Sequence, residues 1–178
     1  MAVRVWRLGA VAGLMALLSA CLPQDAPPSD IRDPKANFAA TSRFDEARFA
    51  GQWLRRATFA GPWQVVSFEY VAAKGGKPGA WREVALNGEA SAYETRVATV
   101  TPDLPGVFTL RYSGGETRQM VVVWVDEGFR TAALATRDGS YAVIVDRKKS
   151  GGADRIVAAK SVLEANGFAV GRMWEPEG

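Results

Sequence analysis

The sequence contains no histidine and only one cysteine, Cys21, among its 178 residues. The lack of histidine excludes a Ser-His-Asp triad, a Cys-His dyad, histidine-ligated zinc or copper, and a haem held by a proximal histidine. The carboxylates are scattered along the chain, and no Asp/Glu pair stands in a context typical of acid–base catalysis. We therefore expect a protein that is not an enzyme and that needs neither a metal nor a cofactor. Catalysis by carboxylate, lysine or tyrosine side chains is the alternative that the composition leaves open.

The chain also lacks a basic block. Its longest positive run is Arg147-Lys148-Lys149, which a turn explains as well as a binding patch does. The whole sequence carries 22 basic and 19 acidic residues, but the first 20 residues hold two of the arginines and no acid. Without that segment the formal charge is +1, so the sequence does not predict a nucleic-acid partner.

The N-terminal segment has the order of charges and apolar residues that is typical of an export signal. Arg4 and Arg7 precede an apolar run over 8–18, which is followed by Ser19, Ala20 and Cys21. The run is shorter than the ~20 residues that a membrane-spanning helix needs. The segment resembles a bacterial lipoprotein signal, which implies cleavage after residue 20 and acylation of Cys21. The competing interpretation is an ordinary signal peptide followed by an incidental cysteine.

This reading divides the chain into a signal peptide over 1–20, a lipidated Cys21 with a flexible Pro-rich tether over 21–42, and one folded domain over 43–178. Prolines and polar residues dominate the tether, and such a segment buries too little apolar surface to offset its ordering entropy. The alternative is an N-terminal strand docked on the domain, which the prolines disfavour. Leu22 replaces the aspartate that retains enteric lipoproteins at the inner membrane, so the resemblance implies anchoring in the outer membrane of a bacterial envelope.

From Phe44 onward the chain alternates between short strand-like runs and turn signals. Asn87-Gly88 favours a type I′ hairpin, and Asp138-Gly139 marks another tight turn. Eight strands with connections mostly of hairpin length predict an up-and-down antiparallel barrel, which leaves no open sheet edge. The predicted strands are 52–59, 63–71, 81–86, 90–100, 107–112, 118–126, 129–136 and 140–147, with a chain break at 102–105.

A change of period near residue 153 predicts one C-terminal helix over 154–165, followed by a short final strand over 168–174. The run from Met120 to Val125 is apolar at both parities. A strand with one wet face would alternate, so this strand is expected to be covered on both sides, by the lumen within and by the helix outside.

Three signatures along the domain resemble those of the lipocalins, particularly the bacterial outer-membrane lipocalins. They are Phe44-Asp45-x-x-Arg48-Phe49-x-Gly51-x-Trp53, Asp126-x-x-Phe129-Arg130-x-Ala132 and Val143-Ile144-Val145-Asp146-Arg147. The resemblance covers residues 44–174. It implies a short helical turn that closes the barrel floor, and an arginine, Arg147, that packs over Trp53. Gly51, Trp53 and Arg147 are therefore expected to have a structural role at this floor, with ligand contact as the alternative for Trp53 and Arg147.

Candidate ligand contacts are the aromatic residues with polar tips and one arginine in the predicted strands. Arg55 has the same parity as Trp53, so it enters the lumen and needs an anion if that face points inward. A surface arginine that lies along the barrel wall is the alternative. Each aromatic residue could equally be ordinary core. The candidates are Arg55, Tyr70, Trp81, Tyr93, Trp124 and Tyr141.

The expected partner is a small hydrophobic or amphipathic molecule, of the fatty acid or lysophospholipid class, bound in the lumen. Ala132, Ala133 and Ala135 occupy little space and favour an open lumen. The alternative is a barrel filled with side chains that has a structural or protein-docking role, because eight strands can enclose either arrangement. A lipocalin-like isomerase or hydratase is a more distant possibility without a candidate acid or base. The oligomeric state is left open.

Overall fold

The computed structural model describes residues 30–60, 63–87 and 92–176. The predicted signal segment 1–20, Cys21 and the part of the predicted tether before Asp30 therefore lie outside the described residues. Within the described residues, no helix is long and apolar enough to cross a bilayer.

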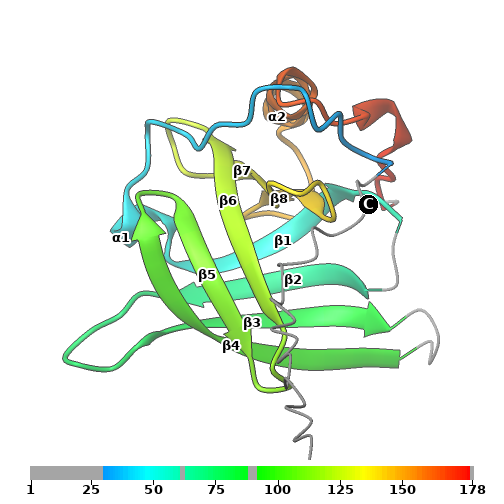
Figure 1. Cartoon of the computed structure of the whole chain (residues 1–178). Coiled ribbons are helices and arrows are strands. Elements are labelled where there is room, and N and C mark those ends of the chain that lie inside the picture. Colours follow the sequence, from blue (N-terminus) through cyan, green and yellow to red (C-terminus); the bar gives the residue numbers. More distant parts are fainter. Residues whose placement is uncertain (1–29, 61–62, 88–91, 177–178) are drawn as a thin grey trace, which may run out of the picture.

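The described residues form eight antiparallel strands that close into a barrel (Figure 1). Each strand pairs with its neighbour in the sequence, and β1 also pairs with β8. This confirms the predicted up-and-down barrel. The strands are β1 (Gly51–Thr58), β2 (Trp63–Val71), β3 (Gly79–Asn87), β4 (Ala92–Leu104), β5 (Val107–Tyr112), β6 (Thr117–Val125), β7 (Thr131–Ala135) and β8 (Ala142–Asp146).

Side chains divide into an inner layer in the lumen and an outer layer beneath the C-terminal helix α2 (Ala153–Ala165). Helix α2 lies on the outside of the barrel against β6, β7 and β8 (Figure 1). On β6, Met120 and Val122 belong to the inner layer, while Val121 and Val123 belong to the outer one. The expectation that this strand is covered on both faces is thus confirmed.

Two bulges change which face the following side chains occupy. The pairing of β1 with β8 shifts between Arg55 and Ala57, and the pairing of β6 with β7 shifts between Val122 and Trp124. An extra residue in one strand sends the next side chains to the opposite face. Ala57 therefore lies in the outer layer, although it has the parity of Trp53.

One predicted strand end and one predicted strand are wrong. Strand β4 continues through Pro102 to Leu104, because a bulge between these residues accommodates the proline where a break was expected. The predicted final strand over 168–174 is instead a 3-10 turn, η1 (Val170–Arg172), between two isolated bridges. Phe168 bridges Arg32 and Trp174 bridges Thr58, so only the two ends of the segment find a strand partner.

Residues 30–42 pack against the barrel and α2, which corrects the expected flexible tether over this range. Arg32 is 8% exposed and donates hydrogen bonds to the carbonyls of Asn166 (3.0 Å) and Arg137 (3.2 Å). The Thr41 amide donates to the Val122 carbonyl at 2.8 Å. The docked N-terminal strand considered as the alternative therefore describes 30–42 better, although the range forms only the single bridge of Arg32, which leaves Pro34 outside any ladder.

Candidate functional site

Helix α1 (Glu46–Phe49) and Arg147 close the end of the barrel at which β1 begins. The Arg147 guanidinium carbon lies 3.6 Å from the centre of the Trp53 ring. The same guanidinium donates to the Gln52 carbonyl at 2.7 Å and to carbonyls at the end of α1. Gly51 has a φ of +97°, which favours glycine, and a Cβ there would lie 3.4 Å from Arg147. Gly51, Trp53 and Arg147, which the sequence assigned to the floor, thus lie together at this end of the barrel.

An aromatic cluster fills the half of the lumen next to this floor. The rings of Phe68 and Trp81 stack with their centres 3.9 Å apart. Tyr70 donates its hydroxyl hydrogen bond to Glu46 of α1, and burial together with this carboxylate raises the pKa of the phenol. Two predicted ligand contacts, Tyr70 and Trp81, therefore pack against other side chains of the protein. The cluster consists of Phe49, Trp53, Phe68, Tyr70, Trp81 and Phe108.

Charged side chains occupy the lumen above this aromatic cluster. Glu83 on β3 is 1% exposed and has the parity of the buried Trp81. Its carboxylate accepts hydrogen bonds from the indole of Trp81 (3.2 Å), the hydroxyl of Tyr112 (3.1 Å) and the guanidinium of Arg96 (3.2 Å). Four groups from β3, β4 and β5 thus satisfy one another, as buried polar groups must.

A second carboxylate, Glu116, joins this layer to the open end of the barrel. Glu116 precedes β6 and forms ion pairs with both Arg96 and Arg118, the latter at 2.9 Å. Both guanidinium groups also lie against the ring of Tyr112, with carbon-to-centre distances of 4.3 Å for Arg96 and 5.4 Å for Arg118. Burial opposes ionisation of Glu116, but the two arginines outweigh it and hold the pKa of this carboxyl below its ordinary value.

Arg55 is the exception to this pairing. Its register partner on β8 is the lumen residue Val145, so Arg55 has an inward position. The Nε and Nη1 atoms of Arg55 are buried and have no hydrogen-bond partner. The guanidinium carbon lies 4.7 Å from the centre of the Trp174 ring. Burial lowers the pKa of Arg55, while the neighbouring phenols of Tyr141 and Tyr93 raise it.

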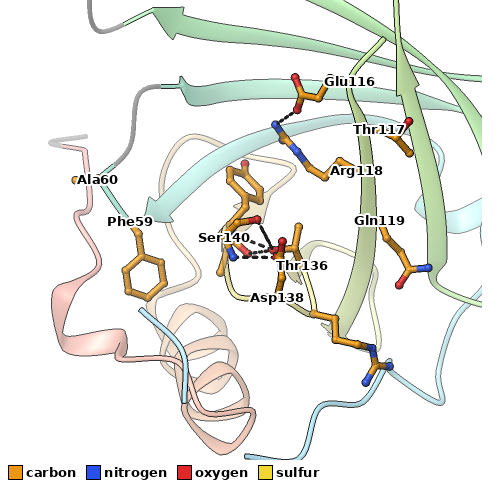
Figure 2. Close-up of a pocket in the computed structure, with 12 residues that line it drawn as sticks. Phe59, Ala60, Glu116, Thr117, Arg118, Gln119, Thr136, Asp138 and Ser140 are labelled. Carbon is orange, nitrogen blue, oxygen red and sulfur yellow. Dashed lines mark hydrogen bonds and ion pairs between the residues drawn. The ribbon is translucent and has the colours of Figure 1, made fainter. Parts of the chain in front are cut away.

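A pocket of about 580 Å³ lies at the open end, between the start of β6, the β7–β8 connection and the end of β1. Figure 2 shows Arg118 and Glu116 above Ser140 and Thr136, with Phe59 at the left. Tyr141 lines the pocket, and its ring centre is 5.2 Å from the Arg118 guanidinium carbon. Tyr141 therefore connects the pocket with the charged layer and with Arg55.

Of the predicted ligand contacts, Trp124 does not line the lumen, and Tyr93 is largely exposed although its phenol lies near Arg55. Trp124 follows the bulge of β6 and packs in the outer layer beside Ala133. Tyr93 is 69% exposed at the beginning of β4. Ala133 and Ala135 also face the outer layer, where they make room for α2, and Ala132 alone of the three alanines lies in the lumen. The small residues of β7 are therefore weaker support for an open lumen than the sequence suggested.

Except for Arg55, the charged residues of the lumen were missed by the sequence reasoning. Arg96 has the parity of Ala98 and Val100, and Glu83 has the parity of Trp81 and Ala85, all of which are buried. A charged residue at an inward parity on each of two adjacent strands was the available signal. Arg118 offered the same kind of signal, because it has the parity of the lumen residues Met120 and Val122. Glu116 lies before the start of β6 and offered none. Within the described residues, no cluster of histidine, cysteine and carboxylate side chains could hold a metal ion.

No protein-family model matches the sequence, and no curated protein does either. Solved structures are similar to it. Apocrustacyanin C2 is 15% identical over 72% of this chain and 76% of its own, with a TM-score of 0.56. Per a 4, a major allergen from cockroaches, is 13% identical over 80% of this chain and 94% of its own, with a TM-score of 0.60.

Insecticyanin from the tobacco hornworm Manduca sexta is 14% identical over 87% of this chain and 88% of its own, with a TM-score of 0.57. These neighbours are lipocalins, and at such low identity the likeness concerns the fold alone. The closed eight-stranded barrel, its C-terminal helix and these neighbours together show that the chain has a lipocalin-like fold.

Proposed function

We propose that this protein binds a small amphipathic anion of the fatty acid or lysophospholipid class at the open end of its barrel. The observation that carries this proposal is the incompletely hydrogen-bonded guanidinium of Arg55. Arginine stays protonated in proteins, so Arg55 cannot relieve its burial by losing its charge. A bound carboxylate or phosphate would supply the charge and the acceptors that Arg55 lacks.

The position of the pocket determines where the apolar part of such a ligand would lie. The aromatic cluster occupies the closed half of the lumen, so an acyl chain has to lie toward the rim. There the pocket wall contains Tyr141 together with Phe59 and Ala142, two residues of the outer layer that border the pocket. A volume of about 580 Å³ is within the range of ligand pockets. This arrangement favours binding, storage or transport of the ligand rather than a reaction on it.

Calorimetric titration of the purified protein with dodecanoate and with dodecanol tests the proposal. We expect dodecanoate to bind with about micromolar affinity and Arg55→Met to weaken it roughly tenfold through the lost charge-assisted bonds. Dodecanol should be affected little, because it carries no charge. Arg56→Met is the matched control, since the neighbouring guanidinium donates to the carbonyls of Lys148 and Gly151 instead. Equal losses in both variants, or no binding by any acyl probe, would contradict the proposal.

We also infer that the barrel is held on a membrane by lipid attached to Cys21, in the outer membrane of a bacterial envelope. The support is the sequence alone: the charged and apolar segment before Ser19-Ala20-Cys21, and Leu22 after it. In cells fed radioactive palmitate, the native chain should be labelled and Cys21→Ser should not. Labelling that survives this substitution would contradict the lipid anchor, and density-gradient fractionation would test the outer-membrane assignment.

The filled barrel with a structural or docking role is the second candidate function. The aromatic cluster in the closed half favours it, because this part of the lumen leaves no room for a ligand. Under this alternative none of the acyl probes binds, and replacement of Arg55 changes stability alone.

A further inference from the structure

Arg96 and Arg118 both form ion pairs with Glu116 near the open end of the barrel. They lie on β4 and β6, and their side chains are 14% and 16% exposed. The ring of Tyr112 on β5, the strand between them, contacts both guanidinium groups and fixes their positions. Two arginines held in this way by a rigid wall present a fork-shaped set of donors that suits carboxylate and phosphate oxygens.

The carboxylate that bridges these arginines is that of Glu116, and its side chain can move away from them more easily than that of Glu83. The Glu116 side chain is 45% exposed, whereas that of Glu83 is 1% exposed and is held by three donors. The backbone of Glu116 stays fixed, because its carbonyl accepts the Tyr112 amide at 2.9 Å. The side chain can therefore rotate into water without a change in the strands.

The charge balance of the lumen also favours an incoming anion. Among the five charged residues named above, Arg55, Arg96 and Arg118 carry three positive charges and Glu83 and Glu116 two negative ones, which leaves one positive charge in excess within this group. When the Glu116 carboxylate turns outward the excess becomes two. A carboxylate headgroup therefore replaces the single charge of Glu116, and a phosphate monoester can neutralise both positive charges.

We propose that Glu116 is an internal occupant of the anion site formed by Arg96 and Arg118, and that the oxyanion headgroup of the ligand displaces it. The inference rests on the proposed function and adds to it a competition that is built into the protein. In the free protein the Glu116 carboxylate keeps the two arginines paired. When a ligand binds, its headgroup takes over these contacts and the Glu116 side chain is hydrated.

Titration of the Glu116→Gln variant with dodecanoate, dodecyl phosphate and dodecanol tests this proposal. Removal of the competing carboxylate should tighten both anions by roughly three- to tenfold and leave the alcohol unchanged. A larger gain for dodecyl phosphate would identify phosphate as the preferred headgroup, and a larger gain for dodecanoate would identify carboxylate. Glu116→Ser, which also removes the carboxylate, should tighten the anions in the same way. A melting curve for each variant shows whether the substitution has altered the fold.

Two controls separate competition from a general change in charge. Asp138→Asn removes the same charge from the pocket wall, where this carboxylate bonds Ser140 rather than Arg96 or Arg118. Its effect on anion affinity should be clearly smaller. In the Arg118→Gln background the gain from Glu116→Gln should become clearly smaller, because one of the two contested arginines is gone.

The outcomes distinguish this proposal from the one on which it rests. If the native protein binds the anions and Glu116→Gln weakens them or changes nothing, Glu116 positions the arginines and the competition is overturned. An equal gain from Asp138→Asn overturns it as well. If neither the native protein nor the variant binds any probe, both proposals fail. Binding by the variant alone supports the displacement directly.

Discussion

Arg55 is a residue that the fold leaves with incomplete hydrogen bonding. Its neighbour Trp174 covers the face of the guanidinium, but a ring cannot replace oxygen acceptors in the plane of the group. A buried donor without an acceptor costs stability in the folded state. Such a residue is typical of positions that are retained for binding rather than for folding.

This cost can be measured without any ligand. Replacing Arg55 with methionine keeps an unbranched side chain and removes the unsatisfied donors, so the free energy of unfolding should rise by about 1–3 kcal/mol. Arg56→Met should lower it, since Arg56 loses a 2.8 Å hydrogen bond to the Gly151 carbonyl. Urea denaturation of both variants checks the pair. A loss of stability in Arg55→Met would mean that the guanidinium contributes to the fold itself.

Among the connecting elements, the β6–β7 turn depends on one carboxylate. Asp126 accepts hydrogen bonds from the amides of Arg130 (2.6 Å), Thr131 (2.7 Å) and Gly128 (3.2 Å). Within this turn Phe129 has a φ of +55°, an unfavourable value for a residue with a side chain. Burial alone would raise the pKa of Asp126, but these donors and the Arg130 side chain outweigh it and lower the pKa.

The lowered pKa predicts how this turn responds to acid. A carboxyl whose pKa falls on folding stabilises the protein above its unfolded value of about 3.9, and the contribution is lost as the pH falls through the folded value. Asp126→Asn should therefore lower the free energy of unfolding by about 1–3 kcal/mol at neutral pH. The difference from the native protein should shrink in acid. Chemical denaturation at neutral pH and at about pH 3 checks this, and an equal difference at both would contradict it.

The bulges explain why the strands could be predicted but not all of their inner faces. Alternation and turn residues locate β2 and β5 at their observed bounds, because these depend on local sequence. Trp124 has the parity of Met120 and Val122, yet an extra residue at Val123 turns it outward. Nothing in the local sequence of β6 marks this bulge, so the lumen prediction failed at Trp124.

At the scale of the whole molecule, the order of elements is encoded locally while the candidate site is not. The lumen charges are paired across strands, as in Glu83 with Arg96 and Arg96 with Glu116. The first of these pairs follows from the hairpin register, in which Glu83 lies opposite Arg96. Arg55 was singled out from its parity with Trp53, and its inward position agrees with the register. Its lack of hydrogen-bond acceptors could not be predicted, because its neighbours Trp174 and Val145 are far from it in the sequence.

The pairing of β1 with β8 has a consequence for the time course of assembly. The floor contact between Gln52 and Arg147 joins residues that are 95 positions apart, so it cannot form until almost the whole barrel has been synthesised. Contacts between such distant residues make folding slow. Until β8 arrives, one edge of β1 stays unpaired and open to association with other chains. During synthesis, β1 of each new chain is therefore exposed to edge-to-edge association for a time. This exposure ends when β8 pairs with β1 and Arg147 packs over Trp53.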